Sequence, residues 1–130
     1  MPYSYSIDTG LQTIFVTAEG KITDTELLTV IRAFNSDTRF HPDMRLLADY
    51  TRVTENRLSS EGMMECARLS KFSPESRRIV LVTGNVEFGM FRVYESYCLV
   101  GGKTTPAVVR DRAQALEFLN VGVPPEKRIT

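Results

Sequence analysis

The sequence predicts an α/β fold with a five-stranded mixed sheet and four helices, and two observations predict it. In two runs, at 3–8 and 11–18, apolar and polar residues loosely alternate, and between them lies the turn-forming sequence Asp-Thr-Gly (8–10). This pattern is typical of a β-hairpin. Three further apolar runs, at 44–50, 77–83 and 105–110, each follow a helix-like segment. Strands that alternate with helices favour parallel pairing, so we expect the strands beyond the hairpin to be mainly parallel.

The hairpin and the first helix carry turn and cap signals. Gly10 can take a positive φ in the hairpin turn, and Gly20 is expected to end the second strand. Thr23 lies three residues before Glu26, which is the spacing of a capping box at the start of a helix. The apolar stripe of this helix consists of Leu27, Leu28, Ile31 and Phe34.

The central strand, 44–50, follows a polar segment in which Pro42 stops any helix. Its centre, 46–48, does not alternate, as expected for a strand that is covered on both faces. Ser59 or Ser60 can cap the next helix. The side chains expected to point inward from that helix are Met63, Met64, Cys66 and Ala67.

The last third of the chain repeats the same alternation. The strand at 77–83 turns at Gly84-Asn85 into a helix at 86–100, which Gly101-Gly102 terminates. A final helix follows the strand at 105–110. We therefore predict a single domain over residues 1–120. The tail, 121–130, contains a Pro-Pro step and few apolar side chains, so we expect an extension or disorder there.

Composition narrows the function classes. Sixteen basic residues balance sixteen acidic ones, so no overall field favours nucleic acid. The N-terminus has no signal-peptide pattern, and no apolar run is long enough for a membrane span. Cys66 and Cys98 are interpreted as small core side chains, not as a disulfide or a metal pair. A cytoplasmic location is the expectation that follows.

Four short motifs in register carry a resemblance to a known family. They are DTRFHP (37–42), Asp49, GMFRVY (89–94) and RDRAQALEFL (110–119). With the order of the elements and the stretch 49–63, they make residues 3–119 resemble STAS domains, named for sulphate transporters and anti-sigma-factor antagonists. The nearest resemblance is to small bacterial STAS-like proteins, which are mostly uncharacterised.

This resemblance implies a right-handed β-α superhelix with an antiparallel first strand at the edge. In anti-sigma-factor antagonists, a partner kinase phosphorylates a serine of an Asp-Ser-Ser-Gly motif at the start of the second helix. The corresponding stretch here, RLSSEG (57–62), lacks the preceding Asp, carries an inserted residue and has Glu61 before the glycine. The same group is compared with lipid-transfer domains of the CRAL-TRIO type, which suggests a ligand groove.

Two sets of polar residues are candidates for a switch or a binding site. Ser59 and Ser60 are either simple helix caps or phosphorylation sites, because a phosphate at a helix N-terminus meets unpaired N–H groups. Candidate ligand- or partner-binding residues at the carboxyl ends of the strands are Asp49, Thr51, Asn85 and Arg110. Turn and cap roles account equally well for the aspartate.

The helix at 86–100 has more apolar residues than one buried stripe requires. Its aromatic side chains together with Arg92 form a composition enriched at interfaces, and Tyr94 is a further candidate for contact with a ligand or partner. Deep burial of the whole helix is the alternative. The composition alone favours neither explanation.

The sequence offers no catalytic or cofactor motif. His41 is the single histidine and has no second histidine or cysteine at ligand spacing, so we predict no metal site. A nucleophile elbow and the glycine spacing of a dinucleotide site are both missing. We therefore predict a non-enzymatic regulatory or protein-interaction module, expected to be a homodimer, without a cofactor. The alternative is a protein that binds a small apolar molecule or a lipid between its helices and sheet.

Overall fold

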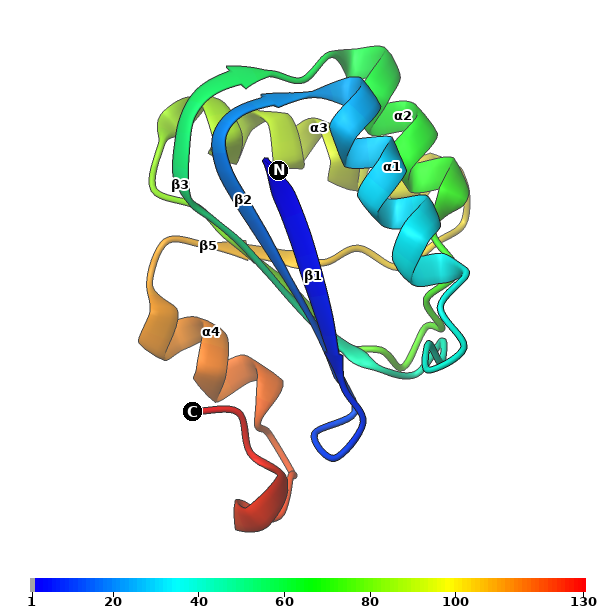
Figure 1. Ribbon diagram of the computed structural model, residues 1–130, viewed down its shortest axis with the longest axis vertical. Helices are drawn as coiled ribbons and strands as arrows, with labels where there is room; N and C mark the ends of the chain where they lie inside the picture. Colours follow the sequence, from blue (N-terminus) through cyan, green and yellow to red (C-terminus); the bar gives the residue numbers. More distant parts are fainter. Residues whose placement is uncertain (1) are drawn as a thin grey trace.

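The computed structural model describes residues 2–130 (Figure 1). A hairpin is followed by alternating helices and strands, and a short 3-10 turn lies near the C-terminus. The strands are β1 (Tyr3–Asp8), β2 (Thr13–Thr23), β3 (Arg45–Arg57), β4 (Arg78–Leu81) and β5 (Ala107–Val109). The helices are α1 (Asp24–Asn35), α2 (Ser60–Leu69), α3 (Asn85–Val100) and α4 (Arg112–Leu119), and the 3-10 turn is η1 (Pro125–Lys127).

The five strands form one sheet in the order β1-β2-β3-β4-β5. β1 and β2 are antiparallel, whereas each later strand pairs in parallel with the one before it. In the parallel register, Phe15 of β2 is opposite Leu47 of β3, which is opposite Ile79 of β4. The mixed sheet and the four helices predicted from the sequence are therefore confirmed.

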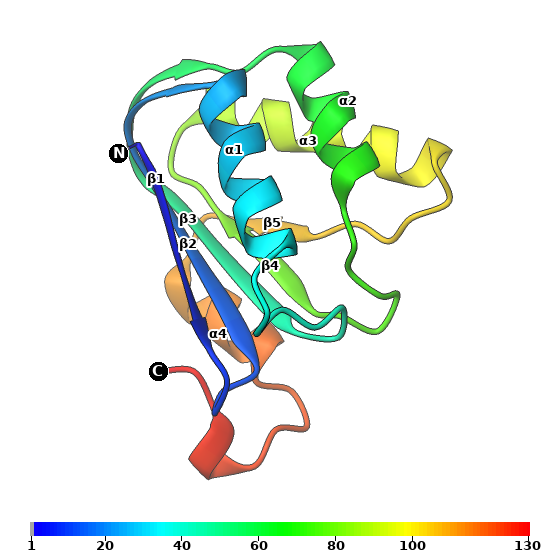
Figure 2. The same ribbon diagram turned by 45° about the vertical axis from the view of Figure 1, so that its right-hand side comes forward.

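The sheet has a different cover on each face (Figure 2). α1, α2 and α3 pack against one face, and most of the buried apolar side chains lie in this layer. The opposite face carries α4 and the end of the chain, with a smaller core of Leu47, Ile79, Ala115, Leu119 and Ile129. The central strand is thus covered on both sides, as its non-alternating centre predicts.

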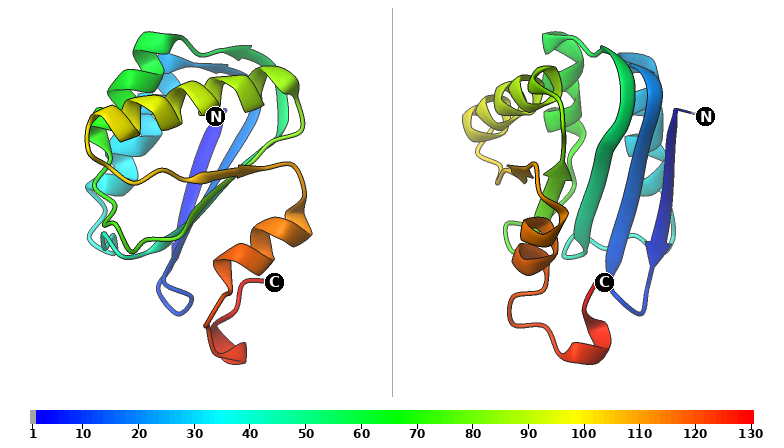
Figure 3. Two further views of the ribbon diagram at one scale, coloured as in Figure 1. Left: turned by 180° about the vertical axis from the view of Figure 1, so that it is seen from behind. Right: turned by 90° about the vertical axis from the view of Figure 1, so that its left-hand side faces the viewer.

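β2 and β3 are longer than predicted and remain paired beyond the end of β4. The predicted end of β2 at Gly20 is wrong, because the strand continues to Thr23 with irregular register on both sides of this glycine. Gly20 has a φ of +72°, which glycine adopts readily. These irregularities accompany the curvature of the two strands at one end of the sheet (Figure 3).

The expected conformation of the hairpin turn also differs in its detail. Gln12, rather than Gly10, takes the positive φ, at 49°. The Asp8 side chain accepts a hydrogen bond from the backbone N–H of Leu11 at 2.9 Å. A carboxylate that satisfies a turn N–H is a common substitute for a glycine-based turn.

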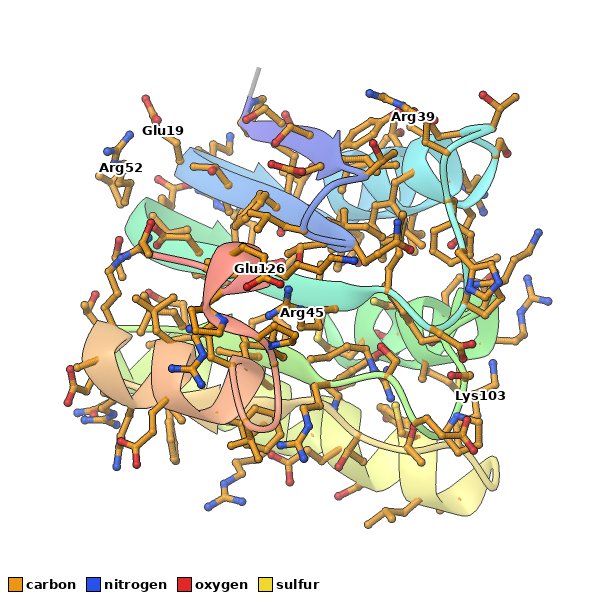
Figure 4. All side chains as sticks on the ribbon, turned by 90° about the horizontal axis from the view of Figure 1, so that it is seen from below. Glu19, Arg39, Arg45, Arg52, Lys103 and Glu126 are labelled. Atoms are coloured by element: carbon orange, nitrogen blue, oxygen red, sulfur yellow. The ribbon has the colours of Figure 1, made fainter. Side chains whose placement is uncertain are left out.

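The C-terminal tail packs on the domain, contrary to the expected extension or disorder. Ile129 is buried, and its N–H donates to the side chain of Asn120 at 2.8 Å. Arg45 donates to the carbonyls of Lys127 at 2.8 Å and Leu119 at 3.1 Å, so one buried guanidinium holds α4 and the tail together. Figure 4 shows Arg45 beside the turn that carries Glu126. No local pattern predicts this arrangement, because the contacts join residues more than seventy positions apart.

No helix within residues 2–130 combines the length and the apolar character needed to cross a membrane.

Candidate functional site

A cavity of about 70 Å³ lies between the sheet and the layer of α1, α2 and α3, and it is partly open to solvent. Most of its lining is apolar and comes from the inner faces of β2, β3 and β4 and from all three helices. The apolar lining residues include Val16, Leu27, Ile31, Ala48, Val80 and Phe91. For comparison, an apolar cavity of about 150 Å³ holds a benzene molecule, so the space in this protein suits a group of few heavy atoms.

Two polar side chains in the lining have buried atoms without a hydrogen-bond partner. These atoms are the Nε of Arg78 and the Oδ1 of Asn35. Among residues 2–130, no other buried side-chain nitrogen or oxygen lacks a hydrogen-bond partner. Buried polar groups are normally paired, because an unpaired one costs about 1–3 kcal/mol. The coincidence of both atoms with one cavity marks this place as a candidate binding site.

Arg78 is the first residue of β4 and is only 3% exposed. Its Nη2 donates to the carbonyl and the hydroxyl of Thr104, at 3.0 and 2.5 Å. Its guanidinium carbon lies 5.1 Å from the centre of the Phe72 ring. These contacts fix one edge of the guanidinium and one of its faces, while Nε remains free.

Asn35, the last residue of α1, also lines the cavity. Its Nδ2 donates to the carbonyl of Leu69 at 3.0 Å, which ties the end of α1 to the end of α2. That bond orients the amide and leaves Oδ1 as a buried acceptor. The cavity therefore offers one cationic donor and one neutral acceptor within an apolar lining.

Tyr94 lines the cavity from α3. The thiols of Cys66 and Cys98, which are both free, are titratable groups near its hydroxyl. Burial raises the pKa of the Cys66 thiol to about 12 and the pKa of Tyr94 well above its usual value. All three groups are therefore neutral at pH 7 and give Arg78 no negative charge.

Tyr50 forms part of another side of the cavity. Its ring makes an edge contact with Phe91, with 4.8 Å between the ring centres. Its hydroxyl is hydrogen-bonded to the hydroxyl of Tyr3 at 2.9 Å, so both phenols are satisfied away from water. The pKa of Tyr50 is raised well above 10.0, chiefly by burial. This side of the cavity is therefore uncharged at pH 7.

The two candidate phosphorylation serines have different surroundings. Ser59 is the N-cap of α2, and its hydroxyl accepts from the N–H of Gly62 at 3.0 Å. The same hydroxyl donates to the carboxylate of Asp24 at 2.5 Å. Ser60 is exposed at the first position of the helix. A cap role thus accounts for Ser59, and Ser60 is the accessible hydroxyl.

The candidate residues at the strand ends fall into separate groups. Thr51 donates to Asp49 through both its N–H and its hydroxyl, at 2.8 and 2.6 Å, and both residues lie within β3 and not in a loop. Arg110 donates to Asn85 at 2.7 Å on the surface. Arg92 and Arg110 each lie against the ring of Phe88, at 5.1 and 4.7 Å from its centre.

Of the candidate binding residues, only Tyr94 lines the cavity. The sequence reasoning missed Arg78 and Asn35. The one available signal for Arg78 is its position as a charged residue at the start of an apolar strand. A charged residue in that position is more commonly exposed to solvent. For Asn35, at the end of a helix, a cap role is the usual interpretation, so nothing local pointed to the cavity.

Comparisons with known proteins identify the fold. No protein-family model matches the sequence, and no curated protein matches it. A solved structure that resembles this chain is that of an uncharacterised DUF3478-family protein with a SpoIIAA-like fold from Shewanella loihica PV-4. The TM-score is 0.57 at 16% identity, and the match covers 90% of this chain and 93% of that one. The protein thus has a SpoIIAA-like, that is STAS-like, fold.

Proposed function

We propose that this STAS-like domain is a small-molecule-binding module that acts by binding and not by catalysis. The observation that carries the proposal is the apolar cavity with two buried, unpartnered polar atoms, Arg78 Nε and Asn35 Oδ1. Binding sites are typically apolar hollows with a few polar groups that orient the ligand. An amphipathic molecule would fill the space and supply both missing hydrogen-bond partners.

The position of the cavity connects binding with the rest of the domain. Leu27 of α1, Cys66 of α2 and Phe91 of α3 all line it, so an occupant touches all three helices of this layer. Filling an empty space in a close-packed core adds van der Waals contacts to each of these helices. The occupied domain should therefore be more stable than the empty one, and its helix layer more rigid.

The first test is native mass spectrometry of the protein purified without detergent, compared before and after denaturation. We expect a small adduct that is lost on denaturation. In parallel, Tm is measured with hexanoate, hexanol and hexylamine, and at least one of them should raise it by several degrees near saturation. Absence of an adduct together with unchanged Tm for all three probes would refute the proposal.

A matched pair of variants locates the binding. Ala48→Ile adds three carbons inside the cavity, because Ala48 lines it from β3 and is 6% exposed. Ala113→Ile makes the same change on the exposed side of α4, away from the cavity. We expect the first variant to lose the adduct and the Tm shift, and the second to retain both. Equal binding by the two variants would place the ligand elsewhere.

A regulatory role through association with a second copy of this chain is the second candidate function. At the end of α3, Leu99 is 69% and Val100 is 88% exposed, which is unusual for two consecutive large apolar side chains. The formal net charge is zero, so no overall repulsion opposes pairing of two copies. Sedimentation should give a dimer that Leu99→Lys converts to monomer. A strictly monomeric wild-type protein would rule this candidate out.

A further inference from the structure

The charge of Arg78 has no counterpart in the part of the chain that the structure describes. Among residues 2–130 no carboxylate forms an ion pair with it. The titratable groups near it are Tyr94 and Cys98, and burial raises the pKa of each, so both are protonated and neutral at pH 7. The two oxygen atoms that it does contact belong to Thr104 and are neutral.

A buried cation without a counter-charge is costly, because it gives up its hydration and receives little in return. Burial accordingly lowers the pKa of Arg78 from its usual value. Arg45 likewise has no carboxylate partner within residues 2–130, and burial lowers its pKa too, but it has more hydrogen-bond acceptors than Arg78 has. Its Nη1 and Nη2 donate to three backbone carbonyls and the amide oxygen of Asn120, whereas Arg78 has the two oxygens of Thr104 and an unpaired Nε.

Among the described residues that line the cavity, Arg78 is also the single charged one. The remaining lining from residues 2–130 is mostly aliphatic and aromatic, and it includes no second cation that would match a doubly charged group. One guanidinium with a free Nε suits one carboxylate, which accepts charge-assisted hydrogen bonds from it. A phosphate monoester carries up to two charges and would leave part of its charge uncompensated in this apolar space.

We propose that the ligand of this cavity is a small monocarboxylic acid, bound with its carboxylate on Arg78 and its apolar part among the cavity side chains. This inference rests on the proposed function and specifies the ligand class. Val80 and Phe91 are two of the side chains that the apolar part would contact. The cavity volume of about 70 Å³ limits the enclosed part to a few heavy atoms, and a longer chain would extend through the opening.

The remaining polar atom, Asn35 Oδ1, needs a hydrogen-bond donor. A carboxylate cannot supply one, because it only accepts. A bound water or a hydroxyl on the acid can. Acids with and without a hydroxyl next to the carboxylate therefore belong in the same titration series, since a hydroxyl that reaches Asn35 would strengthen binding.

The test is calorimetric titration with butanoate, hexanoate, 2-hydroxyhexanoate and hexanol, on the wild type and on two charge-matched variants. Arg78→Met removes the buried guanidinium and keeps a similar length of apolar side chain. Arg77→Met removes the neighbouring charge, which lies on the other side of the sheet, where it contacts Phe118 of α4. Both variants lose one positive charge, so a general electrostatic effect would appear in both.

We expect hexanoate to bind the wild type and Arg77→Met with similar affinity and Arg78→Met at least tenfold more weakly. Hexanol should bind the wild type more weakly than hexanoate and should be insensitive to Arg78→Met. If hexanol binds as tightly as hexanoate, the acid inference fails while the small-molecule function stands. If neither binds and no adduct or Tm shift is seen, both fail.

Arg78→Lys gives a second measurement in case Arg78→Met does not fold. Lysine keeps the positive charge but lacks the planar donor fork. In Arg78→Lys, the affinity for hexanoate should fall by less than in Arg78→Met. It should also remain higher than the affinity for hexanol. Circular dichroism establishes whether each variant is folded. A folded Arg78→Lys or Arg78→Met protein with wild-type affinity for hexanoate would overturn the inference.

Discussion

The carboxylate of Asp24 accepts hydrogen bonds from both the backbone N–H and the hydroxyl of Ser59, at 2.9 and 2.5 Å. Asp24 is the first residue of α1, and Ser59 is the N-cap of α2, so this pair joins the starts of two neighbouring helices. The negative charge also lies near the N-terminus of α2, where the helix dipole stabilises it. The pair thus fixes the relative position of two of the three helices that line the cavity.

This contact predicts opposite responses to a negative charge at the two adjacent serines. Ser59→Asp should destabilise the protein by on the order of 2 kcal/mol, because it places a second carboxylate against Asp24. Ser60→Asp should be neutral or stabilising by up to about 1 kcal/mol, because Ser60 is exposed in the first turn of α2. Urea unfolding of both variants measures the difference. Equal stabilities would mean that Asp24 and Ser59 do not interact in solution.

The same carboxylate explains the glycine at position 62. A Cβ built on Gly62 would lie 2.1 Å from Oδ1 of Asp24, so no larger residue fits unless the carboxylate moves. Gly62→Ala should therefore destabilise by roughly 1–3 kcal/mol, the usual cost of overpacking. Chemical unfolding is the measurement, and Asp24→Ala in the same chain should remove most of the added cost.

Gly89→Ala is the matched control for that substitution. Gly89 is an exposed residue within α3, and a Cβ there has no heavy atom within 4 Å. Alanine should stabilise this helix by about 0.5–1 kcal/mol, because it restricts the unfolded chain and favours helix. A loss of stability at both glycines would show that helix packing, and not the Asp24 contact, determines the result at position 62.

The fold was largely predictable because its signals are local. The alternation of strands and helices, the cap at Ser59 and the terminating glycines after α3 each depend on a few neighbouring residues. The tail was not predictable. Ile129 is buried because Arg45 and Asn120 hold the surrounding backbone, and no short window of sequence contains all three.

The candidate site could be predicted only in part for a similar reason. Tyr94 was identified because α3 is rich in aromatic residues. Arg78 was missed because its importance lies in what surrounds it, namely a cavity that the described residues line with apolar side chains and without a carboxylate. That environment is assembled by β4, three helices and the loop that carries Thr104, so it exists only in the folded chain.

The contacts of Arg45 predict that the tail contributes to stability. Arg45→Met should cost about 1.5–3 kcal/mol, because several buried or half-buried carbonyls lose a charged donor. Arg112→Met, on the exposed face of α4, removes the same charge and should change stability by less than about 0.5 kcal/mol. Thermal unfolding of the two variants measures this difference in stability. Equal, small effects would mean that the tail is not held by Arg45.

Burial of phenol and thiol groups predicts a loss of stability at alkaline pH. The pKa of Cys66 is raised from 9.0 to about 12, and that of Tyr94 is raised well above 10.0, in both cases chiefly by burial. The folded protein therefore holds these protons more tightly than the unfolded chain does. Their contribution to stability is complete below the unfolded pKa values and is lost as the pH rises from there toward the folded ones.

The free energy of unfolding should thus decline from about pH 9 upward, by up to about 1.4 kcal/mol per pH unit for each group. Urea unfolding across this range measures the decline, and Tyr94→Phe, which has no phenol proton to lose, should make it shallower. A flat profile between pH 8 and pH 11 would show that these side chains reach water in the folded protein.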